Sequence, residues 1–198
     1  RCDSFVVETD VHFPTDINLL WDAVRKVLQL THKLSISLGI SGWRQTGHNI
    51  RTMKKLYRRV QKERDRNKFS ASCLSATRQY IDEAQHYFNR ATETLSIAGK
   101  SYPYLEEALI TEIHYFLSHG RRQIRHIIQR CFQGKQIPAY EKVYSLFEEH
   151  TEWISKGKAG VPQELGMRVC IIESEYGFVM HHKVMEHEED RDIAVSII

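Results

Sequence analysis

The sequence lacks the features that mark several less common classes of protein. It contains no run of about 18 apolar residues, which argues against a membrane-spanning helix, and no glycine repeat or polar low-complexity tract. Its 4 cysteines, at positions 2, 73, 131 and 170, include no close pair, so neither a disulfide scaffold nor a C-x-x-C motif is indicated. We therefore expect a soluble, folded, cytoplasmic chain with buried, reduced thiols.

Common motifs of nucleotide binding and nucleophilic catalysis are also missing. There is no P-loop, no Gly-x-Gly-x-x-Gly and no Gly-x-Ser-x-Gly. The net charge of +3 over 198 residues is ordinary for a globular protein, so only the distribution of charge can indicate a partner. Because the chain opens at Arg1 and closes on the apolar residues 193–198, we expect it to be a piece of a longer protein.

Hydrophobic periodicity predicts a strand, then helices, then strands. A strand-like run at residues 4–9 precedes Thr15 or Asp16, either of which can cap a helix. Further helices are expected at about 46–68, at about 70–98 (ending before Gly99), and from Pro103 through Gly120 to about 128, with a short segment at 140–147. Two β-rich runs, 167–174 and 178–185, are joined by a turn at 175–177 that is typical of a hairpin. Acidic residues then precede a helix-like end.

This order predicts an α/β (α+β) fold in which a truncated mixed sheet is interrupted by a large all-helical insertion between the first and second strands. The lone first strand needs partners, and only the distant hairpin can supply them. We expect residues 1–15 to form the first strand, 16–150 the helical insertion, and 151–198 the second and third strands with the start of the next helix.

The strongest local charge lies between Gly42 and Lys68, a segment that contains ten basic residues and only two acidic ones. On a helix, residues three or four positions apart share a face, so this segment would present a stripe able to follow DNA phosphates. A solvated helix face is the alternative. The predicted DNA contacts are Arg44, Arg51, Lys54, Lys55, Arg58, Arg59, Lys62 and Arg66. A second basic cluster, Arg121, Arg122, Arg125 and Arg130, adds weight to an anionic partner.

Three segments together resemble the catalytic region of bacterial insertion-sequence transposases of the DDE type. The first is residues 3–16, Asp-Ser-Phe-Val-Val-Glu-Thr-Asp-Val-His-Phe-Pro-Thr-Asp. The second is Gly-Trp-Arg-Gln at 42–45, with the basic helix behind it. The third runs from 154–158 through 164–169 and the hairpin to 190–195. The resemblance covers most of the chain.

The resemblance implies a ribonuclease H-like fold whose first catalytic aspartate is Asp3, on the first strand. In such enzymes three carboxylates hold two Mg²⁺ (or Mn²⁺) ions about 3.5 to 4 Å apart, which assist DNA strand cleavage and strand transfer. It also implies that the protein binds DNA and is located in the bacterial nucleoid. A homodimer bound to the transposon ends is compatible with the resemblance. The second and third carboxylates are expected beyond Ile198, so the chain alone should be inactive. The alternative is a non-catalytic helical module that binds nucleic acid.

Overall fold

The computed structural model describes residues 2–101, 107–155, 163–186 and 188. The chain divides into two compact units. Residues 15–142 form the first, the helical unit, and residues 1–14 together with 143–198 form the second, the sheet unit. The helix-like end expected after the acidic residues lies outside the described residues, as does Pro103.

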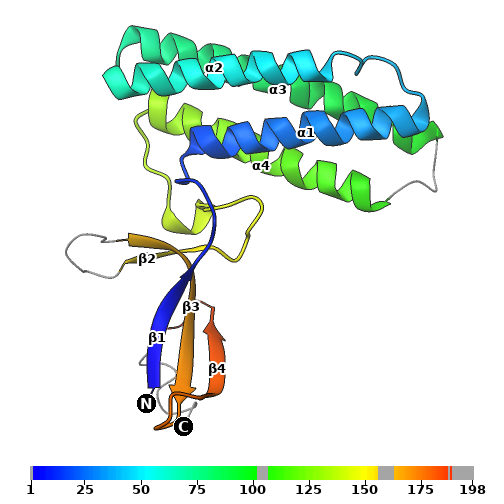
Figure 1. Cartoon of the computed structure of the whole chain (residues 1–198). Coiled ribbons are helices and arrows are strands. Elements are labelled where there is room, and N and C mark those ends of the chain that lie inside the picture. Colours follow the sequence, from blue (N-terminus) through cyan, green and yellow to red (C-terminus); the bar gives the residue numbers. More distant parts are fainter. Residues whose placement is uncertain (1, 102–106, 156–162, 187, 189–198) are drawn as a thin grey trace. The chain divides into compact units, whose positions relative to one another are not determined.

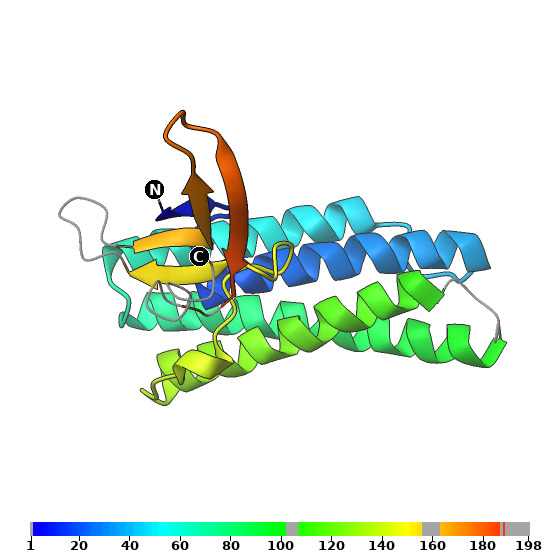
Figure 2. The same cartoon turned by 90° about the horizontal axis from the view of Figure 1, so that it is seen from below.

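The helical unit is a bundle of four helices followed by one short turn of 3₁₀ helix. Successive helices run in opposite directions (Figures 1 and 2). Helix α1 contacts the other three and packs most extensively against α4. The elements are α1 (Asp16–Leu38), α2 (Thr46–Arg66), α3 (Ala71–Ser101), α4 (Glu107–Phe132) and η1 (Ala139–Glu141).

Both ends of α1 have the caps that the local sequence favours. The Thr15 hydroxyl accepts a hydrogen bond from the Asn18 amide at 3.1 Å, which satisfies one of the amides that the first turn leaves open. At the other end Gly39 adopts a left-handed conformation with φ 64°, which costs glycine nothing. The predicted cap at Thr15 is confirmed.

The bundle core depends on one close approach between α3 and α4. Phe88 of α3 is fully buried, and Gly120 lies in the middle of α4. A β-carbon on Gly120 would lie 2.6 Å from Phe88 Cε2 and nearer still to Cζ, well inside the usual 3.5 to 4.0 Å contact. Glycine at 120 therefore lets the Phe88 ring fill the space between the helices.

One predicted helix boundary needs correction. Helix α3 continues through Gly99 to Ser101 rather than ending before Gly99, because a helical glycine costs only about 1 kcal/mol and the helix is already fixed by its buried residues. The short segment expected at 140–147, for which no type of structure was predicted, begins with the 3₁₀ turn Ala139–Glu141. The prediction that all the thiols are buried is also wrong, since Cys2 is exposed; it lies on an edge strand.

The described residues of the sheet unit form four strands, of which β3 is the longest and pairs with the other three. They are β1 (Cys2–Glu8), β2 (Glu152–Ser155), β3 (Gln163–Glu173) and β4 (Val179–Met185). β1 pairs with β3 along one edge, whereas β2 and β4 pair with its first and second halves respectively. The β3–β4 hairpin turns at Gly177, with φ 78°. The predicted hairpin is confirmed. Its predicted pairing with the first strand, which lies at the other end of the sequence, is confirmed as well (Figure 1).

Gly166 lies at a close approach between β1 and β3 in the sheet unit. It pairs with Glu8 of β1 and with Glu152 of β2, and a β-carbon there would overlap the Val7 carbonyl, 2.9 Å from its carbon and nearer to its oxygen. Beside it, the Thr9 amide donates to Leu165 O at 3.1 Å and the Thr9 hydroxyl lies 3.0 Å from that of Thr151. These contacts hold the end of β1 against the start of β3.

The described part of the chain is thus α+β, with four α-helices and a four-stranded sheet. All described strand pairs are antiparallel, so the parallel pairing that a mixed sheet requires is not among them. The short strand β2 was not predicted, because four residues carry too little periodicity to distinguish a strand from a loop. The ribonuclease H-like topology and the role of the helices as an insertion stay predictions.

Candidate nucleic-acid interface

Helix α2 carries a line of basic side chains, which we call the basic stripe. At about 100° per residue, its members all lie within about 80° of Arg51. Each is exposed, and Arg44, the remaining predicted DNA contact, is exposed just before the helix. The basic stripe consists of Arg51, Lys54, Lys55, Arg58, Arg59, Lys62 and Arg66.

The opposite face of α2 fixes the direction of the stripe. Met53 and Val60 are fully buried and lie about 180 to 200° around the helix from Arg51. The Tyr57 ring stacks on Trp21 of α1 with centroids 5.5 Å apart, and its hydroxyl donates to Asn18 Oδ1 at 3.1 Å. Because rotation of α2 would expose these apolar groups, the basic stripe is held towards solvent.

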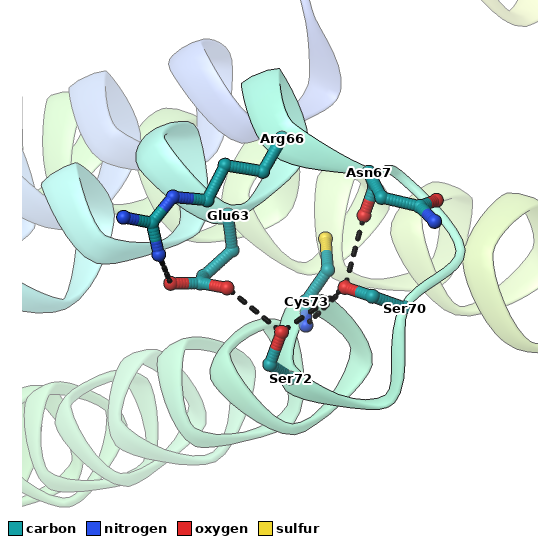
Figure 3. A network of polar contacts seen from close by, with 6 residues as sticks. All are labelled: Glu63, Arg66, Asn67, Ser70, Ser72 and Cys73. Atoms are coloured by element: carbon teal, nitrogen blue, oxygen red, sulfur yellow. Dashed lines mark hydrogen bonds and ion pairs between the residues drawn. The ribbon is translucent and has the colours of Figure 1, made fainter.

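Two members of the stripe are engaged within the bundle. Arg59 Nη1 donates to Gln79 Oε1 at 2.9 Å. Arg66 Nη1 lies 3.4 Å from Glu63 Oε1, and the other oxygen of Glu63 accepts from the Ser72 hydroxyl at 2.7 Å (Figure 3). Within the described part of the chain, no ion pair is found for Arg51, Lys54, Lys55, Arg58 and Lys62. These five are the members of the stripe for which the described part of the chain shows neither an ion pair nor a hydrogen bond to another side chain.

Arg44 lies at a hollow of about 540 Å³ before α2. Arg90 from α3 reaches into the same region, donating to Gly42 O at 2.6 Å, and its guanidinium is 4.9 Å from the centre of the Trp43 ring. Trp43 is buried and its indole donates to Thr94 Oγ1 at 2.9 Å. The Gly-Trp-Arg-Gln segment therefore anchors the start of α2 to α3, and Arg44 is exposed two residues before the helix.

The second basic cluster is used mainly for packing. Arg121 Nη2 donates to Thr92 Oγ1 at 2.8 Å, and Arg130 Nε lies 3.2 Å from Asp16 Oδ2. Arg122 is half-buried and Arg125 is exposed. Arginines that hold helices together in this way are less available to an external anion than the five unpaired cations of α2.

A buried charge cluster that the sequence did not reveal lies at the base of the bundle. His126 of α4, 1% exposed as a side chain, has Nδ1 3.8 Å from Asp16 of α1 and Nε2 3.4 Å from Glu141 of η1. Burial lowers the pKa of His126, and Asp16 and Glu141 oppose that effect, whereas Arg125 adds to it. Burial also raises the pKa of Asp16, against the attraction of Arg130. No sequence signal links these residues, because three separate elements bring them together.

Asp3 lies near the start of β1, on the exposed face of that strand. Its side chain accepts a hydrogen bond from the Ser4 amide at 3.0 Å, and its cross-strand neighbour is Ile171, which in turn pairs with His182. Strand alternation puts Glu8 on the other face. Among the residues described, no group of three histidines, cysteines or carboxylates is placed to hold a metal ion. The role of Asp3 as a metal ligand stays a prediction.

Comparison with protein-family models, with curated proteins and with solved structures finds no significant match to this chain. Within the described residues, no helix is both long enough and apolar enough to cross a lipid bilayer. The chemistry of the basic stripe and the sequence segments described above are therefore what indicate a function for this chain.

Proposed function

We propose that this chain is part of a DNA transposase of the DDE type, and that its basic stripe binds the DNA backbone. The observation that carries the binding proposal is the exposure of five unpaired cations on one face of α2, directly opposite its buried face. Phosphate neutralisation by lysine and arginine releases counterions, and is independent of base sequence. Neither the stripe nor Arg44 indicates recognition of a particular DNA sequence.

The catalytic part of the proposal depends on the resemblance of residues 3–16 to the family's first catalytic strand. Asp3 is the proposed first carboxylate, and the pairing of β1 with the distant β3–β4 hairpin is consistent with it. The proposal requires an aspartate and then a glutamate further along the coding sequence. If the coding sequence stops directly after Ile198, the alternative of a non-catalytic nucleic-acid-binding module is favoured instead.

The binding proposal is tested by matched charge removal. Lys55→Gln with Lys62→Gln removes two cations of the basic stripe, and Lys33→Gln with Lys135→Gln removes two equally exposed lysines from other parts of the helical unit. For duplex DNA, each lost phosphate contact should lower the slope of log K against log salt by about 0.9. We expect a flatter slope and weaker binding for the first pair and little change for the second.

A larger variant sharpens the result. Replacing Arg51, Lys55, Arg58 and Lys62 by glutamine removes four of the eight predicted contacts and should lower the slope of log K against log salt by up to about 3.6. The helical signal at 222 nm should stay intact, since all four side chains are exposed. Equal effects of the two lysine pairs would indicate a response to net charge alone. In that case the stripe is a solvated surface, and the proposed interface is wrong.

A further inference from the structure

The sheet unit holds two thiols in contact across neighbouring strands. Cys2 of β1 pairs with Ile172 of β3, and Cys170 of β3 pairs with Ser4 of β1. Both cysteines therefore lie on the same face of the sheet, one step apart on the diagonal. Their sulfur atoms are 3.4 Å apart, although 167 residues separate them in the chain. No sequence spacing would have indicated this pair.

The two thiols differ in their access to solvent. Cys2 is exposed at the beginning of β1, whereas Cys170 is 3% exposed and packs beside Met185. On its other side Cys170 faces Lys183 of β4 in the strand register. In such an arrangement the exposed thiol reacts first with an oxidant. The buried thiol then attacks the oxidised sulfur and forms a disulfide with it.

A disulfide between them needs only a small movement. The bond length is about 2.05 Å, so the sulfur atoms must approach by about 1.4 Å. Among the described strands, β1 pairs with β3 alone and forms an edge of the sheet, so no other strand opposes a shift at Cys2. Diagonal cross-strand positions are typically about 7–8 Å apart, at or just beyond the distance of about 7 Å that a disulfide bridges without backbone movement. Closing the bond therefore requires a shift of the edge strand β1, which favours a reversible bond over a permanent structural one.

We propose that Cys2 and Cys170 form a reversible dithiol–disulfide pair that reacts with low-molecular-weight disulfides. The Cys2 thiolate attacks one sulfur of the small disulfide, whose bond breaks and releases one small thiol, which takes up the proton that Cys2 lost. The Cys170 thiolate then attacks the Cys2 sulfur and releases the second small thiol. The protein loses two hydrogens and the small disulfide gains them; excess small thiol reverses both steps. This proposal does not depend on DNA binding or on catalysis by Asp3.

The test uses the full chain with Cys73→Ala and Cys131→Ala, which leaves only the proposed pair. After incubation with glutathione disulfide, we expect a monomer whose mass is lower by two hydrogen atoms, with no free thiol and no glutathione adduct. Dithiothreitol should restore both thiols. Adding Cys170→Ser should stop the reaction at one glutathione attached to Cys2. A matched variant carries Cys2→Ala and Cys170→Ala instead and keeps Cys73 and Cys131. Its two thiols should stay reduced over the same time.

Other outcomes would overturn the proposal. These are a stable glutathione adduct with Cys170 still free, a disulfide between two chains, or equal thiol loss in the matched variant. Since Cys73 is buried and its replacement can impair folding, the wild-type chain is also oxidised and digested without reduction. We expect the peptide containing Cys2 to be joined to the peptide containing Cys170. If it is joined to another cysteine, or remains reduced, the pairing is wrong.

Discussion

Replacing Gly120 by alanine tests the packing of α3 on α4. The added methyl group would lie 2.6 Å from Phe88 Cε2 and 3.2 Å from Ala23 Cβ. Against an ordinary carbon contact of at least about 3.5 Å, the Phe88 ring must retreat by about 0.9 Å or more. The ring is 0% exposed, so it cannot move aside into solvent and must displace its neighbours in the core.

The expected loss of stability follows from two opposing effects. Overpacking a full core costs about 1–3 kcal/mol, and the overlap here puts the cost at about 2–3 kcal/mol. Alanine is more favourable than glycine in a helix by about 1 kcal/mol, so the free energy of unfolding should fall by a net of about 1–2 kcal/mol. Gly99 is the matched control, because it also lies in a helix but a β-carbon there meets nothing within 4 Å. Gly99→Ala should therefore raise the free energy of unfolding by up to about 1 kcal/mol.

Urea denaturation followed at 222 nm measures both variants. The two substitutions are chemically identical, so their free energies of unfolding should differ by about 2–3 kcal/mol. Phe88→Leu shortens the opposing side chain and should reduce the penalty of Gly120→Ala when the two are combined, as coupling between touching residues requires. Equal stabilities of Gly120→Ala and Gly99→Ala would refute this account of the core.

Three further results are expected. Thr15→Ala should lower the free energy of unfolding by about 1 kcal/mol, whereas Thr15→Ser should retain most of the cap; equal losses would contradict the capping role. Gly166→Ala should separate β1 from β3, and faster amide exchange at Val7 with unchanged α1 amides would show it. Burial holds the pKa of His126 below its ordinary 6.5, so the unfolded chain takes up a proton first as the pH falls. Stability of the helical unit should decrease from pH 7.5 to 6, and His126→Gln should reduce that decrease; an unchanged slope would argue against it.

The local features of this chain were predictable because they depend on residues close together in sequence. The cap at Thr15 and the turn at Gly177 follow from the conformational preferences of single residues. The basic stripe follows from helical periodicity once Met53 and Val60 are assigned to the core. The predicted site residues on α2 are accordingly all exposed, although what they bind is still a proposal.

Helix α3 shows where local reasoning fails. Gly99 is a strong local signal for a helix end, yet the helix continues past it to Ser101. The propensity of one residue is worth about 1 kcal/mol, and burial of side chains such as Phe88 earlier in the same helix outweighs it. The short strand β2 was missed for the opposite reason, since its pairing with β3 supplies what its four residues do not signal.

By itself, the sequence determined the composition, the amphipathic helices, the hairpin and the charge carried by α2, because each depends on neighbours within a few positions. Only the tertiary structure decided which distant groups meet. It placed Cys2 against Cys170, buried His126 between Asp16 and Glu141, and required glycine at 120 and 166. Contacts of that kind depend on how whole helices and strands pack. That packing is driven by the burial of their apolar faces, and the spacing of residues along the sequence does not indicate it.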